Sequence, residues 1–179
     1  MSIGFKEWAL ICSALGSGGQ SIILRKGGIA EGREGFRFEH PEFLLFPTLF
    51  HEQVAKLKLP QETPLPHVAS GQHTLTHKVV VNWTRDLIDW EQIARLAPFH
   101  LWTSQTIRER FEYDDHNGIS LAFVRVFALG KPLSFPDAPK YGGCRSWVTV
   151  PTEGSLPAEP VLSDAEHLAR ETSVLEALR

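Results

Sequence analysis

A pair of cations followed by two glycines stands out early in the chain. The sequence "ILRKGGI" at 23–29 places Arg25 and Lys26 at the end of an apolar run, directly before Gly27 and Gly28. A strand that ends in this way presents fixed positive charges beside backbone N–H groups that no Cβ covers, a combination suited to phosphate or carboxylate. Adjacent strand residues point to opposite faces, so at most one of the two cations faces a given pocket. The alternative is a solvated strand end and turn.

A second stretch, "YGGCRSW" at 141–147, has a similar design. Gly142 and Gly143 precede Arg145, Ser146 and Trp147, and Trp102 offers another aromatic surface elsewhere in the chain. An arginine, an aromatic ring and free backbone amides together stack on and hydrogen-bond a base or another planar ligand. The alternative is a tight turn that enters a core strand, with Cys144 as a small buried residue. We expect one binding site if the two stretches are neighbours.

Arg125 interrupts the most apolar run of the chain, "LAFVRVFAL" at 121–129. A charge there must reach solvent or find a partner, because an unpaired buried charge is costly. Two interpretations remain open. Arg125 forms a structural ion pair with Glu39, Glu42 or Glu52, or it lines a polar pocket.

An enzymatic alternative uses His51. In a hydrolase or nuclease, His51 would act as acid or base with Glu52 or Glu42 assisting, and the basic residues would stabilise an oxyanion or phosphate. The stretch "HEQVA" at 51–55 lacks the second histidine of a zinc helix, and His67, His73 and His77 have no acid or cysteine at ligand spacing. We therefore predict no metal and no cofactor.

The charge balance limits the possible partners. The chain carries a net charge of −3, yet residues 151–179 hold six acidic residues and two arginines, which leaves residues 1–150 at +1. A basic patch on this body must be local. Only two cysteines occur, and no apolar run reaches membrane-spanning length. We predict a cytoplasmic protein that does not associate with membranes.

The order of elements predicts an α+β fold. Apolar runs at 8–15 and 21–25 around "GSGG" indicate a β-hairpin, although a short helix from residue 5 is an alternative. Strands are expected at 77–83, 119–129 and 144–150, and helices at 49–57, 86–97 and 104–113. We predict a mixed, mostly antiparallel sheet or partial barrel, with two or three packed helices and a C-terminal helix.

The C-terminal segment is expected to be separable. We predict a single α+β domain at 1–150, a linker at 151–162 and an amphipathic acidic helix at 163–179, which Ser163 and Glu166 begin with a capping box. An apolar stripe runs along this helix through Ala165, Leu168, Thr172, Leu175 and Leu178. The helix either packs on the body or offers the stripe to a protein partner.

Seven short motifs occur together in a recognisable order. They are "KEWA" at 6–9, "LRKGGI" at 24–29, "FLLFPT" with His51 at 43–51, "LW" before Thr103, "RF" at 110–111, "VRVFAL" at 124–129 and "YGGCRSW" at 141–147. Over residues 5–150 the chain resembles an uncharacterised bacterial family, domain of unknown function 1802. The resemblance implies one coherent domain and brings no established activity.

Three functions follow from these observations. The first is a binding module for an anionic or nucleobase-bearing ligand, including nucleic acid, that uses Arg25, Lys26, Arg125 and Arg145 with Trp102 and Trp147. The second is the hydrolase or nuclease built on His51. The third is an adaptor that binds a protein partner through residues 163–179.

Overall fold

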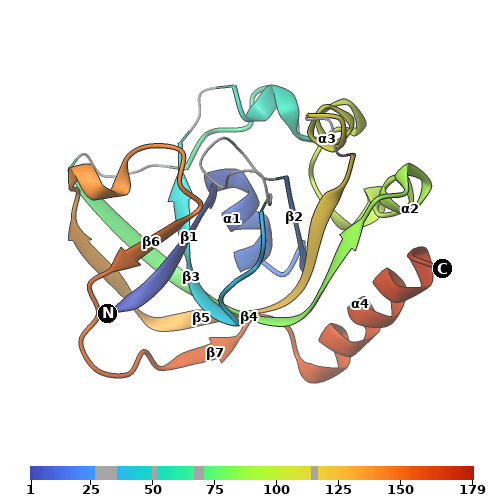
Figure 1. Ribbon diagram of the computed structural model, residues 1–179. Helices are drawn as coiled ribbons and strands as arrows, with labels where there is room; N and C mark the ends of the chain where they lie inside the picture. Colours follow the sequence, from blue (N-terminus) through green and yellow to red (C-terminus); the bar gives the residue numbers. More distant parts are fainter. Residues whose placement is uncertain (27–35, 50–51, 67–70, 114–116) are drawn as a thin grey trace.

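The fold is built on one mixed sheet. The computed structural model describes residues 1–26, 36–49, 52–66, 71–113 and 117–179 (Figure 1). Within these residues the strand order is β2-β5-β4-β3-β1-β6, with β7 paired to β5. The strands are β1 Ser2–Trp8, β2 Ile22–Arg25, β3 Glu42–Thr48, β4 Gln72–Leu87, β5 Ile119–Pro136, β6 Trp147–Val150 and β7 Ala158–Pro160.

Helices lie against and around this sheet. The α-helices are α1 Ala9–Gly16, α2 Trp90–Arg95, α3 Ser104–Phe111 and α4 Asp164–Ala177, and short 3-10 helices are η2 Val54–Lys56, η3 Ala97–Phe99 and η4 Pro139–Tyr141. Strands β1 and β3 pair in parallel, whereas the other pairings are antiparallel. The sheet is not closed. The prediction of an α+β fold with a mostly antiparallel sheet and a C-terminal helix is confirmed.

Two long strands form the middle of the sheet. β4 and β5 pair along almost their whole length, from Gln72 opposite Pro136 to Leu87 opposite Ile119. The register shifts between Leu75 and His77, where β4 advances from 75 to 77 while β5 advances from 133 to 128, and such an irregularity moves the following side chains to the other face. Leu75 therefore packs in a small cluster with Phe46 and Phe135, whereas Val79 belongs to the main core around α1.

The expected hairpin at residues 8–25 is wrong. Residues 2–8 form β1 and residues 9–16 form α1, whose Leu10, Ile11 and Leu15 are buried. The run "ALICSAL" is apolar on almost every face, so its pattern does not separate a buried helix from a buried strand. Ala and Leu favour the helix. The chain then turns through Gly18, which has a φ of 74° that glycine adopts without strain.

Several other elements agree with the sequence. Thr103 caps α3 by accepting a hydrogen bond from the N–H of Thr106, and Ile107 and Phe111 are buried on one face of that helix. The helix expected at 86–97 is shorter, because α2 begins after Asp89 and ends at Arg95. Of the helix expected at 49–57, the structure describes only η2 and its flanks; residues 50–51 lie outside the described residues.

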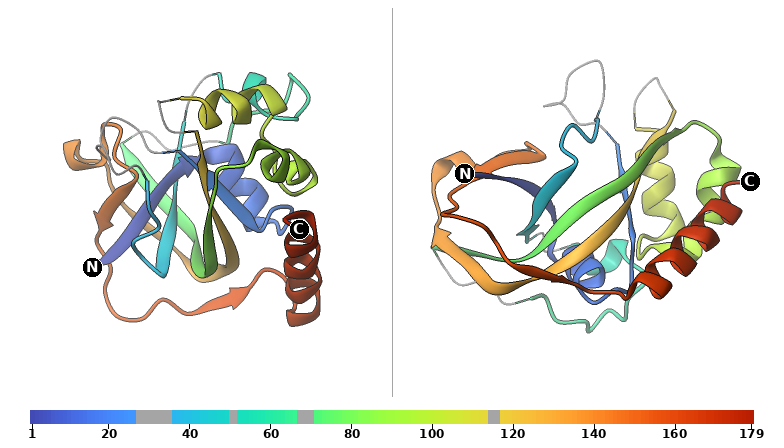
Figure 2. Two further views of the ribbon diagram at one scale, coloured as in Figure 1. Left: turned by 45° about the vertical axis from the view of Figure 1, so that its right-hand side comes forward. Right: turned by 90° about the horizontal axis from the view of Figure 1, so that it is seen from below.

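The C-terminal segment lies against the body. Strand β7 pairs with β5, and α4 begins with the predicted capping box between Ser163 and Glu166. Figures 1 and 2 both place α4 beside α2, on the opposite side of the molecule from β6. Val174 and Leu178 are buried, whereas Leu168 is 63% exposed. Of the apolar stripe read from the sequence, only Leu178 is buried, so the stripe coincides with the packed face only at its C-terminal end.

Candidate functional site

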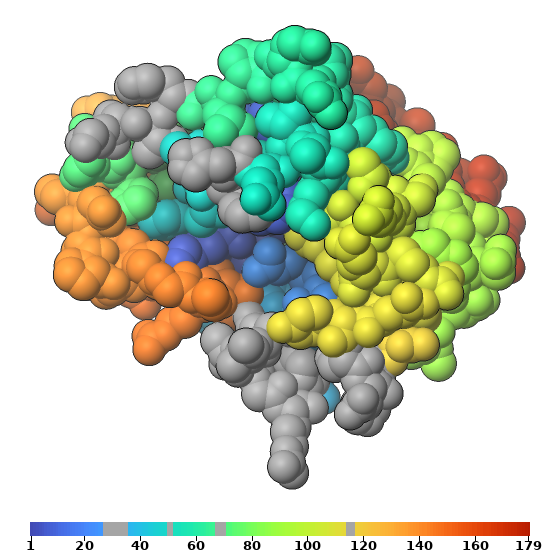
Figure 3. Space-filling view, turned by 90° about the horizontal axis from the view of Figure 1, so that it is seen from above, coloured from blue at the N-terminus to red at the C-terminus, as the bar shows by residue number. Residues whose placement is uncertain are grey.

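The two basic stretches meet in the folded chain. Arg25, the last residue of β2, donates a hydrogen bond from Nη2 to Oγ of Ser146, which directly precedes β6, over 2.8 Å. Ser146 is 3% exposed and Trp147 is half-buried beside it. Seen from above, the N-terminal part of the chain is recessed between orange residues near 140–147 and the yellow region of α3 (Figure 3). The neighbourhood expected from the sequence is present for Arg25 and Ser146.

A buried carboxylate supports Arg25. Oε2 of Glu7 lies 3.7 Å from Nη1 of Arg25, and the Glu7 side chain is 1% exposed. The other carboxylate oxygen accepts the backbone N–H of Trp8 at 2.8 Å. Oε2 of Glu7 and Nε of Arg25 are both buried and have no hydrogen-bond partner among the described residues. Such unmatched polar atoms are uncommon in folded proteins, and a bound water, ion or polar ligand group would satisfy them.

A second arginine, Arg110, lies beside the first. Its guanidinium sits 3.6 Å from the centre of the Trp102 ring and 5.4 Å from that of Trp8, and Nη1 donates to the carbonyl of Leu24 at 3.4 Å. The pKa of Arg110 is lowered to about 10. Burial is the main cause, Arg25 acts in the same direction, and Glu7 raises the pKa against both. Arg110 therefore stays charged at neutral pH. We call Glu7, Arg25, Arg110 and Ser146 the arginine cluster.

Aromatic rings surround the arginine cluster. The Arg25 guanidinium lies 5.1 Å from the ring centre of Phe5 and 5.5 Å from that of Phe36. Phe36 and Trp147 stack at an interplanar angle of 17°, with 6.0 Å between their centres. Rings in this arrangement attract the guanidinium through their π faces and restrict its position. Trp102 is 1% exposed, so it serves as a platform for Arg110 instead of an open surface.

Lys6 fixes the glycine corner. Its Nζ donates to the carbonyls of Gly142 and Gly143 at 3.3 and 2.8 Å, and its backbone N–H donates to the carbonyl of Ser146 at 2.8 Å. Burial lowers the pKa of Lys6, with Arg145 adding to the effect and Cys144 opposing it. Gly143 turns the chain with a φ of 74°. These contacts hold Ser146 in place against Arg25.

Other predicted residues of the corner face outward. Cys144 is exposed, so the interpretation of a small buried cysteine is wrong. Arg145 is also exposed, on the rim next to the Lys6 contacts. Lys26 is half-buried and follows the end of β2. Gly27 and Gly28 lie outside the described residues.

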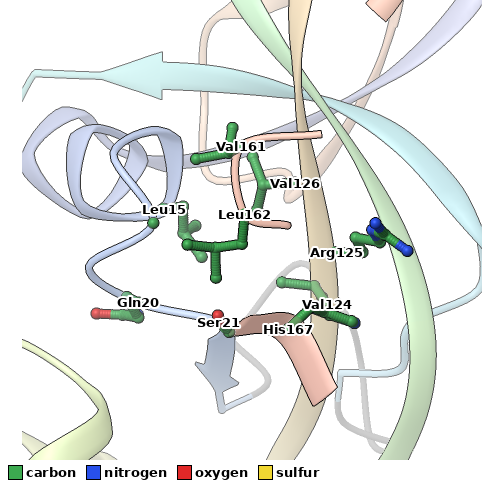
Figure 4. Close-up of a pocket in the computed structure, with 10 residues that line it drawn as sticks. Leu15, Gln20, Ser21, Val124, Arg125, Val126, Val161, Leu162 and His167 are labelled. Atoms are coloured by element: carbon green, nitrogen blue, oxygen red, sulfur yellow. The ribbon is translucent and has the colours of Figure 1, made fainter. Parts of the chain in front are cut away.

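Arg125 does not join the arginine cluster. It forms an ion pair with Asp164 at the start of α4, so the expected partners Glu39, Glu42 and Glu52 are wrong. Figure 4 shows its guanidinium directed away from a cavity of about 10 Å³ that Leu15, Ser21 and His167 help to line. A cavity of that size holds no more than a water molecule. Sequence alone did not predict this partner, because it depends on how α4 docks.

The enzymatic candidates are dispersed among the described residues. Glu42 begins β3 and forms an ion pair with Lys78 at 3.4 Å. Glu7 lies opposite Pro47, near the other end of β3, so Glu42 is distant from the arginine cluster. Glu52 is exposed in a turn. His51 lies outside the described residues. Within the described part of the chain, no three His, Cys, Asp or Glu side chains are grouped to hold a metal ion.

Sequence reasoning did not select Glu7, Lys6 or Arg110 for the site. All three nevertheless belong to the short motifs of the family resemblance, "KEWA" and "RF". A glutamate at the end of an apolar strand was the available signal, because such a group requires a cation once it is buried. The two cations near Glu7 come from β2 and α3, and no local pattern specifies that these elements meet the end of β1.

Comparison with protein families gives one clear result. The model of the family described as "Domain of unknown function (DUF1802)" matches residues 4–173. The chain belongs to this family. The match to DUF1802 includes β7 and most of α4 in addition to the sheet. No curated protein matches the sequence significantly.

Solved structures resemble this DUF1802 chain only distantly. The crystal structure of ASCH from Zymomonas mobilis has 11% identity and a TM-score of 0.48, covering 96% of this chain and 93% of that chain. The crystal structure of a single-residue variant of the same protein has 11% identity and a TM-score of 0.48, and the match covers 96% of both chains. Similarity of this size does not indicate a shared activity. Among the described residues, no helix is long and apolar enough to cross a membrane.

Proposed function

We propose that the arginine cluster is the binding site of a module for an anionic ligand, of which nucleotides and single-stranded nucleic acid are the nucleobase-bearing examples. The observation that carries the proposal is the contact of Arg25 with Ser146, which joins the two basic stretches. Arg25 and Arg110 face one carboxylate, that of Glu7, so this group of side chains carries a net positive charge. A phosphate would balance it.

The ligand would approach from the rim of the cluster. Lys26 and Arg145 add positive charge there, and Ser146 supplies a hydroxyl close to Arg25. Half-buried Trp147 offers part of a ring on which a base stacks. Trp102 and Arg125, which the sequence placed in the site, take other roles in this proposal: Trp102 supports Arg110, and Arg125 anchors α4.

The test compares two arginines of equal charge. Binding of a fluorescein-labelled single-stranded oligonucleotide, followed by anisotropy, should weaken about tenfold or more in Arg25→Gln, because a charge-assisted hydrogen bond is lost. Arg125→Gln is the matched control and should bind nearly as the parent chain does. Raising the salt concentration should weaken the parent's binding and have less effect on Arg25→Gln.

One complication is built into the cluster. Arg25→Gln leaves Glu7 buried without its ion-pair partner, which itself destabilises the fold. The double variant Glu7→Gln with Arg25→Gln removes the pair together, and circular dichroism verifies that it folds. If the folded double variant binds the oligonucleotide as tightly as the parent, the arginine cluster is not the site. Equal losses in Arg25→Gln and Arg125→Gln would indicate nonspecific attraction instead.

The remaining sequence hypotheses stay predictions. The hydrolase or nuclease built on His51 with Glu52 or Glu42 predicts cleavage of the labelled oligonucleotide during the same titration, which gel electrophoresis would reveal. The adaptor hypothesis requires a protein partner at residues 163–179. A cytoplasmic location is also still a proposal, in keeping with the free thiols of Cys12 and Cys144.

A further inference from the structure

A second concave site lies apart from the arginine cluster. A cavity of about 400 Å³, partly open to solvent, lies between α1, the end of β3 and the first half of β4. Its walls include Cys12, Ser13, Pro47, Gln72, Thr74 and His77, and none of the four residues of the arginine cluster. This volume lies within the range of about 300–1,000 Å³ that small-molecule sites occupy.

The described residues that line the cavity are apolar or neutral polar, apart from His73 and His77. None of these described lining residues is Lys, Arg, Asp or Glu, and the imidazole of His73 is already hydrogen-bonded to Asp137 at 2.7 Å. Burial raises the pKa of Cys12 well above the usual value, so its thiol stays protonated. Burial also lowers the pKa of His77, whose Nδ1 lies 2.9 Å from Oγ1 of Thr76. A charged ligand would lose its hydration here without gaining a counter-ion, so the lining favours a neutral one.

The backbone of β4 supplies directional hydrogen bonds. Among the described residues, β3 pairs with β4 only at 78–80, so the edge of 72–77 borders the cavity instead of another strand. The carbonyl of Gly71 accepts the N–H of Asp137, on the β5 side. Because antiparallel strands alternate the direction of their polar groups, Gln72 and Thr74 direct N–H and C=O away from β5, toward the cavity.

We propose that this cavity binds a small uncharged molecule that carries an N–H beside a C=O, the edge of a cyclic amide. Such an edge matches a free strand edge, which presents the same two groups in the reverse sense. Two kinds of molecule share this chemistry, pyrimidine bases such as uracil and cyclic dipeptides. The proposal concerns residues outside the arginine cluster and does not depend on anion binding there.

Four probes separate the parts of the proposal. Uracil has the amide edge, 1,3-dimethyluracil lacks its N–H groups, orotate adds a carboxylate to uracil, and cyclo(Gly-Gly) carries the edge on a peptide ring. Each is titrated into the ¹⁵N-labelled chain while the amide signals of residues 72–77 are followed. Uracil or cyclo(Gly-Gly) should shift them, and whichever binds more tightly identifies the source. Dimethyluracil and orotate should bind about tenfold more weakly or not at all, because a hydrogen bond is lost or a charge is buried.

Variants test the location. Ser13→Phe fills the cavity from an exposed position of α1 and should abolish the shifts, whereas Ser17→Phe, one turn further along and outside the lining, should keep them.

Gly16→Ala is a second, smaller change that tests the same location. A Cβ at residue 16 would lie 2.5 Å from Cε1 of His77 and push that ring from its place in the cavity wall, whereas a Cβ at Gly19 meets nothing closer than 3.5 Å. Gly16→Ala should weaken probe binding, and Gly19→Ala should not.

Clear results would overturn the proposal. They are equal binding of uracil and 1,3-dimethyluracil, tighter binding of orotate than of uracil, shifts that persist in Ser13→Phe, or no shift with either cyclic amide at millimolar concentration. Oligonucleotide binding by Ser13→Phe provides the independent reference. It should equal that of the parent chain, so failure of one site is distinguishable from failure of the other.

Discussion

At the scale of single residues, Glu7 is the residue that defines the arginine cluster. Its carboxylate is buried at the end of β1, and its neighbours Arg25 and Arg110 come from β2 and α3. A buried carboxylate of this kind stabilises the fold only while its cation is in place. The same carboxylate also competes with any anionic ligand for Arg25. Glu7 therefore ties the stability of the chain to the proposed binding.

Replacing Glu7 by Gln should make this link measurable. The change keeps the shape of the side chain but leaves two guanidinium groups without a counter-charge, so the free energy of unfolding should fall by about 3 kcal/mol or more. Added phosphate should restore part of that loss by taking the place of the carboxylate. Urea denaturation with and without phosphate measures both effects. Glu42→Gln breaks only the surface pair with Lys78, and should cost less than about 1 kcal/mol.

His100 predicts the effect of acid on stability. Burial, together with Lys58 and Arg110, lowers the pKa of its imidazole to about 3, whereas a histidine in the unfolded chain has a pKa of about 6.5. Below pH 6.5 His100 of the unfolded chain binds a proton, whereas His100 of the folded chain stays neutral down to about pH 3. The free energy of unfolding should therefore fall by about 1.4 kcal/mol per pH unit toward pH 3 through this residue alone. Urea denaturation of His100→Gln should show a smaller dependence over that range, and an unchanged slope would contradict the assignment.

The sequence predicted some of these residues and not others. Arg25, Ser146 and Trp147 could be found from local patterns. In "ILRKGGI" two glycines follow the cations at the end of an apolar run, and in "YGGCRSW" two glycines precede Arg145. Their contact also depends on β1 lying between β3 and β6, an arrangement that leaves no mark near either stretch. Arg110 is one of several charged residues on α3, and only packing on Trp102 distinguishes it.

At the scale of elements, α4 shows how an amphipathic pattern misidentifies a face. The stripe through Leu168 and Leu175 has helical spacing and only its last member, Leu178, is buried. The packed face instead holds Val174 and His167, which lies against Phe123 with 5.0 Å between ring centres. Polar contacts fix this rotation. Nε1 of Trp83 donates to Glu171 at 2.7 Å, and Arg95 donates to the carbonyl of Ala177 at 2.7 Å. These partners lie on β4 and α2, so the helix sequence alone could not specify the face.

Two matched truncations test the face that α4 uses. Val174→Ala should lower the free energy of unfolding by about 2 kcal/mol, because it removes two methyl groups from a buried contact. Leu168→Ala should change it by less than about 0.5 kcal/mol, because that side chain is 63% exposed. Thermal or urea unfolding distinguishes the two. If Leu168→Ala is the more costly change, the stripe read from the sequence is the packed face.

At the scale of the whole molecule, the sequence predicted the class of fold and not its connections. Helices and strands could be expected from periodicity, and their proportions favoured α+β. Strand order could not be expected, because β1 pairs with β6 almost at the other end of the sheet-forming chain. The boundary predicted at residue 150 stays a prediction, and β7 and α4 beyond it make contacts with β4, β5 and α2.

Removing residues 161–179 tests that boundary. The shortened chain should still fold, because α4 adds no strand to the sheet, but its Tm should fall by about 10 °C as Trp83 and Phe123 lose their cover. Far-UV circular dichroism during heating measures both points. An unchanged Tm would show that residues 161–179 do not stabilise the body. Complete unfolding of the shortened chain would show that they are part of the core.

The pairing of β1 with β6 also has a consequence for biosynthesis. Ser2 lies opposite Val150, and Arg25 meets Ser146 across 121 residues of sequence. During translation, which adds about 5–20 residues per second, the N-terminal strand must wait for β6 before this edge of the sheet is complete. The arginine cluster is consequently among the last parts to assemble. A nascent chain or proteolytic fragment that stops before residue 146 cannot form it, so ligand binding by the arginine cluster would report that the chain has been made at least as far as the start of β6.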